Sequence, residues 1–189
     1  VTTLFHEFGH TLHHILTAQT EPQVSGINGV EWDAVELPSQ FLENFAWEHE
    51  IVKSISAHVE TGEQLPDELF DKMIAAKNYE AGAFCVRQVE FALFDMLLHS
   101  AFDPKTDSVQ ALLDSVRREV AVVFPPAWNR FPQSFSHIFA GGYGAGYYSY
   151  KWAEVLSADC FSAFEEEGVL NPDTGRRYLK EILERGSSR

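Results

Sequence analysis

Basic residues are scarce in this sequence. Its 189 residues include 14 Lys and Arg against 28 Asp and Glu, which gives a formal net charge of −14. An acidic chain is poorly suited to electrostatic capture of nucleic acid or of an anionic membrane surface, so we expect neither among its partners. A solvated surface is the commoner reason for such a charge, although an acidic rim can also attract basic peptides or cations.

Cysteine and long apolar runs are also in short supply. Cys85 and Cys160 are the two cysteines, and neither belongs to a CxxC pair. Such sparing use is typical of a reducing compartment, which predicts a cytoplasmic protein. No stretch approaches the roughly 20 apolar residues of a membrane-spanning helix, and the N-terminal residues do not resemble a signal peptide. Because the chain begins with Val1 rather than Met, we expect a piece of a longer polypeptide.

Sustained strand alternation is missing as well, and no internal repeat is evident. Helical periodicity runs through most of the chain and predicts an all-α fold, with residues 1–189 forming a single helical domain. An aromatic and glycine-rich stretch, 127–146, has no clear period and is expected to form an ordered loop. The expected helices span residues 2–18, 33–57, 67–76, 78–100, 108–122, 147–167 and 174–185.

A possible metal-binding motif opens the chain. His6-Glu7-Phe8-Gly9-His10 has the pattern HExxH. Two histidines four residues apart share one face of a helix, so both imidazoles can reach one metal ion, and nitrogen ligands suit Zn²⁺. Glu7 lies about 100° around the helix from His6, where it can take a proton from a water whose pKa the zinc lowers to about 7. The five-residue pattern also occurs by chance in helices, so its interpretation as a metal site requires a third ligand elsewhere in the chain.

Acidic residues in the next predicted helix supply candidates for that third ligand. Catalytic zinc typically has three protein ligands and one open position. Glu36 and Glu43 are seven residues apart and share a helix face, and Asp33 lies nearby. We predict that Glu36 is the third ligand, and that Asp33 and Glu43 accept N–H groups from the ligating histidines; a plain amphipathic helix is the alternative. His13 and His14 could extend the histidine stripe, but structural or surface roles are commoner for such residues.

The loop near residue 140 is the second informative stretch. Four of the six residues from Gly141 to Gly146 are glycine, which permits close approach of the backbone to a ligand. His137 and the neighbouring tyrosines are neutral donors that can stabilise the oxyanion of peptide hydrolysis; loss of one such donor typically costs about 10²–10³ in rate. A well-packed tyrosine-rich loop without chemistry is the alternative, and the zinc motif favours catalysis.

Three separated motifs, in residues 6–10, 33–44 and 136–152, resemble the thimet oligopeptidase family of zinc metallopeptidases, and the resemblance covers nearly the whole chain. It implies the multi-helix catalytic lobe of a gluzincin-type enzyme, with one Zn²⁺ per chain and short peptides as substrates. It also implies that an N-terminal lobe of the same polypeptide family, which this chain lacks, forms the opposite wall of the substrate channel.

The resemblance also implies roles for individual residues. The metal ligands would be His6, His10 and Glu36, and Glu7 would be the general base. The loop residues that stabilise the oxyanion would be Tyr150, Tyr143 and His137, and Tyr147 would contact substrate. A helical zinc- or peptide-binding fragment that is inactive because half of its cleft is missing is the alternative to an active endopeptidase.

Overall fold

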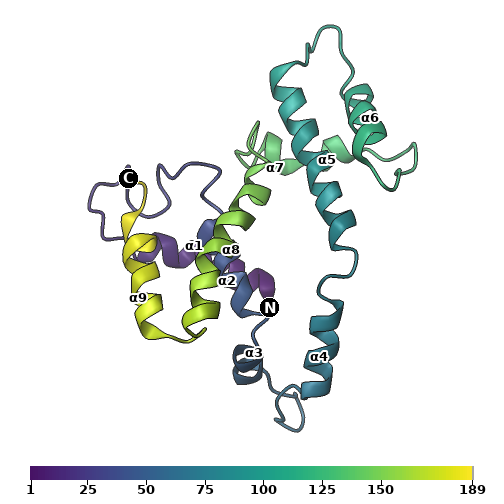
Figure 1. The fold of residues 1–189 in the computed structure, drawn as a ribbon. Helices are drawn as coiled ribbons and strands as arrows, with labels where there is room; N and C mark the ends of the chain where they lie inside the picture. The colour runs from purple at the N-terminus through teal and green to yellow at the C-terminus, as the bar shows by residue number, and fades with distance from the viewer. Residues whose placement is uncertain (189) are drawn as a thin grey trace. The chain divides into compact units, whose positions relative to one another are not determined.

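The computed structural model describes residues 1–188, and its regular elements are all helical (Figure 1). The described residues contain no strand, which confirms the all-α prediction. No helix within this part of the chain is both long and apolar enough to cross a bilayer. The elements are α1 (Thr2–Ile15), α2 (Leu37–Phe45), α3 (His49–Ile55), α4 (Asp67–Ala76), α5 (Ala81–Ser100), α6 (Val109–Val120), η1 (Phe131–Ser134), α7 (Ser136–Phe139), α8 (Ser149–Glu167), α9 (Pro172–Glu181) and η2 (Leu183–Arg185).

The long helix expected over residues 33–57 is wrong, because two shorter helices, α2 and α3, occupy this region. Pro38 explains the later start. Its ring would clash with the carbonyl of residue 34 in a continuous helix, and it has no N–H to donate there, so Pro38 lies in the first turn of α2. The break at residues 46–48 has no glycine or proline signal. Ala46 is buried there, and Trp47 receives the Lys77 ammonium over its ring at 5.1 Å. Tertiary packing thus accompanies the interruption.

The chain divides into two compact units. The first unit combines residues 1–78 with the chain from Trp152 onward, and the second unit comprises Tyr79–Lys151. The metal motif falls in the first unit and the glycine-rich loop in the second. That residues 1–189 act as one catalytic domain stays a prediction.

An aromatic cluster joins α2, α8 and α9 within the first unit. Phe41 of α2 is buried and stacks on Tyr178 of α9, with ring centroids 4.0 Å apart. The Asn44 amide of α2 donates to the Ser157 hydroxyl of α8 at 3.1 Å. On its other side α2 packs against α1. The buried members of the cluster are Phe41, Phe161 and Phe164.

The second unit is built around α5 and α6, which pack side by side (Figure 1). The expected loop over 127–146 includes two short helical segments, η1 and α7, and its aromatic side chains contribute to the core of the unit. An ion network accompanies that core, in which Arg87 and Arg117 both donate to the buried Glu90 carboxylate. The buried core residues are Phe94, Leu113, Val116, Phe135, Ile138 and Tyr147.

Candidate metal centre

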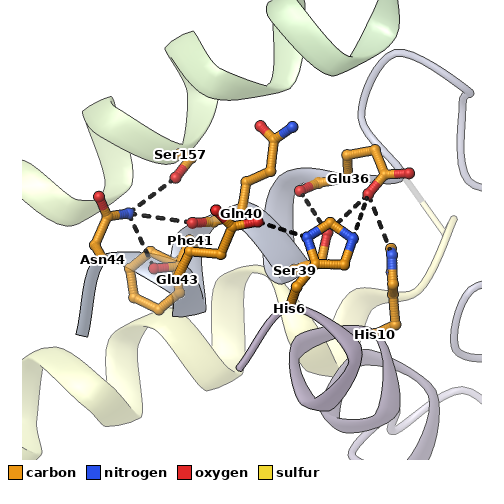
Figure 2. A network of polar contacts seen from close by, with 9 residues as sticks. All are labelled: His6, His10, Glu36, Ser39, Gln40, Phe41, Glu43, Asn44 and Ser157. Atoms are coloured by element: carbon orange, nitrogen blue, oxygen red, sulfur yellow. Dashed lines mark hydrogen bonds and ion pairs between the residues drawn. The ribbon is translucent and has the colours of Figure 1, made fainter. Parts of the chain in front are cut away.

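Helices α1 and α2 bring three possible metal ligands together. His6 and His10 lie one turn apart on α1, with ring centroids separated by 5.0 Å and planes nearly perpendicular. Both rings turn toward the carboxylate of Glu36, as Figure 2 shows. The Glu36 Oε2 atom lies 3.3 Å from His6 Nε2 and 3.2 Å from His10 Nε2. Ligand atoms of these three residues all fall within 4.8 Å of one another.

Glu36 is the cap residue that precedes α2, rather than an interior residue of a longer helix. Its side chain is only 2% exposed. A buried carboxylate is costly unless hydrogen bonds or opposite charges compensate it. The Ser39 hydroxyl lies 2.9 Å from both Oε2 and the main-chain carbonyl of Glu36, and can donate to one of them at a time. The two imidazoles supply the remaining compensation on the side that faces α1.

The donor atoms fit a zinc ion in both type and spacing. Around a tetrahedral zinc with bonds of about 2.0–2.1 Å, neighbouring donor atoms are roughly 3.3 Å apart. The distances from Glu36 Oε2 to the two histidine Nε2 atoms, 3.3 and 3.2 Å, agree with that spacing. Two imidazoles and a carboxylate are also a ligand set that zinc commonly takes, with a fourth position open.

Glu43 holds the other side of the His6 ring. Its Oε1 lies 2.6 Å from His6 Nδ1, and an ionised carboxylate only accepts, so Nδ1 carries the hydrogen and donates it. Hydrogen bonds to Glu36 and then to Glu43, opposed by burial, raise the pKa of His6 from 6.5 to about 10. A metal ion would compete with the Nε2 proton, because only a neutral imidazole is a ligand. Glu43 therefore orients the ring and fixes which nitrogen faces Glu36.

The remaining residues predicted around the metal differ in their surroundings. Glu7 is exposed, one position after His6 on α1. Asp33 is half-buried in the turn that leads to α2. His13 is only 3% exposed, and burial lowers its pKa, so it is a neutral, buried residue; His14 is exposed. Among the described residues, His10 Nδ1 is buried without a hydrogen-bond partner.

Gly9 sets how near the two helices approach. A β-carbon at this position would meet the Pro38 carbonyl group and lie 2.5 Å from Ser39 Cα, both parts of the α2 backbone. Gly9 is buried, whereas its neighbours Glu7 and Phe8 are exposed. The missing side chain therefore lets the α1 backbone contact α2 between the two histidines. This contact brings the imidazoles to Glu36.

The four loop residues predicted to act on substrate form an aromatic group in the second unit. The Tyr143 and Tyr150 rings stack at 4.9 Å, and His137 lies against both, with centroids 6.2 and 5.9 Å away. Tyr147 also contacts His137 but is buried, and its hydroxyl donates to Gln88 Oε1 at 2.9 Å. The structure thus gives Tyr147 a clear packing role, and its contact with substrate stays a prediction.

Three residues near these groups were not found from the sequence. Gly9 had a signal, since it lies between the two histidines of the motif, but its role depends on a contact with α2. Ser39 follows Glu36 at a helix start, where a hydroxyl commonly bonds locally. Asp95 is one of two acids in the otherwise largely apolar helix α5, the other being Glu90, and its 0% exposure separates it from an ordinary surface residue. Its partners, described below, are about 50 residues away in the chain.

Comparison with known proteins decides the family. The model of peptidase family M3 matches residues 1–189. The chain belongs to peptidase family M3. Oligopeptidase A of Salmonella typhimurium and oligopeptidase A of Escherichia coli are each 60% identical to it over 189 residues. Saccharolysin of Saccharomyces cerevisiae is 34% identical over 187 residues.

The M3 relatives are much longer than this chain. The alignments cover 100% of the chain for both forms of oligopeptidase A and 98% for saccharolysin. They cover only 28%, 28% and 26% of those proteins, respectively. The chain therefore spans about 28% of the length of these two forms of oligopeptidase A. The family resemblance expected from the three sequence motifs is confirmed.

Proposed function

We propose that the chain is the zinc-binding catalytic part of an endopeptidase that hydrolyses short peptides. The observation that carries this proposal is the approach of two imidazole Nε2 atoms to one buried carboxylate oxygen, at 3.3 and 3.2 Å, in a chain of peptidase family M3. His6, His10 and Glu36 would hold one Zn²⁺. The names of the relatives, oligopeptidase A and saccharolysin, support a peptide substrate.

The general base in this proposal is Glu7. When bound, zinc would polarise the scissile carbonyl and lower the pKa of a water to about 7. The Glu7 carboxylate would take the proton of the attacking water and later give it to the leaving amine. Its exposed position, one residue from His6 on α1, leaves it accessible to both. Glu43 would hold His6 through Nδ1, and Asp33 is the second residue proposed to support a ligand.

The tyrosine loop, defined as residues 137–150 from α7 to the first turn of α8, would stabilise the charge that develops on the carbonyl oxygen. Tyr150 is the main candidate donor, with Tyr143 or His137 in support, because hydroxyl and imidazole N–H groups aimed at an oxyanion stabilise it. The stacking of Tyr143 on Tyr150 favours a joint role, since each ring restrains the other. Tyr147 is proposed to contact substrate.

An inactive zinc- or peptide-binding fragment is the alternative. Helix α1, which carries the two histidines, exposes Leu4 and Phe8 on either side of Glu7 in the sequence; these residues are 71% and 52% accessible. Such openness to water weakens the electrostatic effects on which hydrolysis relies. A further proposal follows, that an N-terminal lobe of the same polypeptide family supplies the opposite wall of the peptide channel. Without that wall, zinc could bind while hydrolysis fails.

The substitution Glu7→Gln tests the mechanism. Zinc content, measured by elemental analysis, should stay near one ion per chain, because Glu7 is not a ligand. Cleavage of a short internally quenched peptide should fall by about 10²–10⁴, the usual contribution of a general base. Glu50→Gln, which makes the same change at an exposed position of α3, is the matched control and should retain both properties.

Each outcome distinguishes one hypothesis. Unchanged cleavage in Glu7→Gln would show that the general-base mechanism is wrong. A wild-type chain that binds zinc but cleaves no peptide would favour the inactive fragment. No stoichiometric zinc in the wild-type chain would contradict the metal site itself.

We also propose a cytoplasmic location and the absence of nucleic-acid and membrane partners. Both described cysteines, Cys85 and Cys160, are free thiols, which suits a reducing compartment. The net charge of −14 opposes binding to polyanions. Fluorescence microscopy of a tagged chain is the direct measurement of its location.

A further inference from the structure

Asp95 of α5 is a buried carboxylate that the proposed mechanism does not use. Its side chain is 1% exposed. Oδ1 accepts the Ala145 N–H at 2.9 Å, and Oδ2 accepts the Tyr147 N–H at 2.9 Å. His99, one turn later on α5, brings its Nδ1 to 2.8 Å from Oδ1. A buried charge requires such compensation, and here most of it comes from the backbone of the tyrosine loop.

The loop adopts an unusual backbone conformation where it meets Asp95. Ala145 has φ +57°, in the left-handed region that residues other than glycine rarely occupy, and Gly142 has φ +85°. For Ala145, which has a side chain, such a conformation is unfavourable and persists only where the surroundings hold it. N–H groups presented by this kind of turn form a concave anion site. The Asp95 carboxylate occupies that site from within the protein.

The same turn carries the tyrosines. The Tyr143 carbonyl accepts the Gly146 N–H at 2.8 Å, and the Tyr143 N–H donates to the His137 carbonyl at 3.0 Å. Tyr150 follows within one turn of Tyr147 and stacks on Tyr143 at 4.9 Å. In the sequence, the two residues that Asp95 binds, Ala145 and Tyr147, therefore lie between the two tyrosines whose rings stack. A shift of this turn would change the separation of their hydroxyls.

We infer that Asp95, supported by His99, is a positioning residue that holds the tyrosine loop in the conformation needed to act on the substrate carbonyl. Asp95 touches neither substrate nor metal; it acts through the Ala145 and Tyr147 amides on Tyr143 and Tyr150. This inference rests on the proposed function for its catalytic consequence. The structural part of the inference, that Asp95 fixes the conformation of the loop, can be tested whether or not the chain hydrolyses peptides.

The first test measures the loop directly. Asp95→Asn keeps the shape of the side chain but removes its charge and one acceptor oxygen. Amide hydrogen exchange, followed by NMR in the 189-residue chain, should become about tenfold or more faster at Ala145 and Tyr147, because hydrogen bonds to charged acceptors are the stronger ones. The ring-proton shifts of Tyr143 and Tyr150, which report their stacking, should change as well.

Matched variants separate a local effect from general loss of structure. Asp114→Asn makes the same charge change on α6 of the same unit, where the Asp114 carboxylate accepts from Gln110, and should leave the loop amides unchanged. His99→Gln removes the supporting imidazole, whose side chain is 33% exposed, and should accelerate the same amides by a smaller factor. If Asp95→Asn does not fold, His99→Gln carries the test alone.

The second test addresses catalysis. Asp95→Asn should lower kcat for a short peptide by about tenfold or more, by analogy with loss of an oxyanion donor, with a smaller change in KM and unchanged zinc content. Combined with Tyr150→Phe, the loss should be less than the product of the two single losses, since both act on one group. If Asp95 merely stabilised the unit, the kcat losses of Asp95→Asn and Tyr150→Phe would be independent and would multiply in the double variant.

The outcomes distinguish the inference from the proposed function. Unchanged exchange at Ala145 and Tyr147, or equal acceleration across the whole second unit, overturns the fixing of the loop. If amide exchange in the loop becomes faster but the kcat loss of the double variant equals the product of the losses in Asp95→Asn and Tyr150→Phe, Asp95 does not act through Tyr150. A third outcome is faster amide exchange confined to the loop in Asp95→Asn, together with a wild-type chain that cleaves no peptide. This outcome supports the fixing of the loop and contradicts the proposed function instead.

Discussion

Gly9 lies where the backbones of α1 and α2 come into contact, between the two histidines of the metal motif. A side chain there would collide with main-chain atoms of Pro38 and Ser39, which cannot rotate away as a flexible side chain can. The position is therefore restricted by space rather than by backbone conformation. The pattern HExxH by itself does not contain this requirement, because it leaves both central residues undefined.

Gly9→Ala should consequently weaken both the fold and the metal site. Overpacking at the helix contact should lower the free energy of unfolding by about 1–3 kcal/mol. Zinc affinity should fall as well, because His6 and His10 move away from Glu36. Gly175→Ala on α9 is the control, since no atom lies within 4 Å of its added β-carbon. Denaturant melts and zinc titrations that gave the same result for both variants would contradict the role of Gly9.

Glu43→Gln tests whether the hydrogen bond to His6 Nδ1 supports metal binding. The neutral amide is a weaker acceptor and no longer fixes the ring as firmly, so zinc affinity should fall by about 10–100-fold. Competition with a chromogenic chelator measures that affinity. Glu165→Gln, an exposed site on α8 in the same unit, should bind zinc like the wild-type chain. Equal affinities for Glu43→Gln and the control would show that Glu43 is only a neighbour.

Some residues of the metal site and of the tyrosine loop could be predicted from the sequence, and others could not. The spacing of His6 and His10 and the acid at Glu36 follow helical geometry, and the three side chains do meet in the structure. The Ser39 hydroxyl and the buried Asp95 carboxylate carry no comparable pattern. Their roles depend on which backbone or carboxylate atoms lie beside them after folding.

Helix α2 connects the metal site to the core of the first unit. Its N-terminus presents Glu36, its middle buries Phe41, and Asn44 near its end bonds to α8. Sequence periodicity predicted the existence of this helix but placed its start near residue 33. The signal that corrects the start, Pro38, was present in the sequence, whereas the end at Phe45 has no glycine or proline signal and coincides with the packing of Ala46 and Trp47.

Phe41→Ala should therefore lower the stability of the unit that holds the metal site. Removal of a buried aromatic side chain typically costs about 3–5 kcal/mol. Zinc at roughly 100 times its dissociation constant should restore about 2.7 kcal/mol if the metal site survives. Chemical denaturation with and without zinc measures both quantities. Leu69→Ala, at an exposed position of α4, should change stability by at most about 0.5 kcal/mol.

The chain consists of two compact units, and each unit carries a different part of the proposed catalytic machinery. The proposed metal ligands belong to the first unit, and His137 and the loop tyrosines belong to the second. Helical periodicity predicted the class of the fold, and the described residues confirm it. The division into units could not be predicted, because one of its two boundaries, between residues 151 and 152, falls inside the continuous helix α8.

Zinc should protect the two units unequally. A ligand stabilises the state to which it binds, so zinc should slow amide exchange chiefly in the first unit, around α1 and α2. Hydrogen exchange measured by mass spectrometry, with and without zinc, assigns the protection to each unit. The core of α5 and α6 is the internal reference. Protection concentrated in the second unit would contradict the proposed ligands.

The glycine contact between α1 and α2 has a practical consequence for protein engineering. Transplanting the five-residue motif into an unrelated helical scaffold would carry over both imidazoles but not the neighbouring backbone. A recipient without an equally close partner segment would hold the donors too far apart. A successful graft would need the two segments moved together, as a single module.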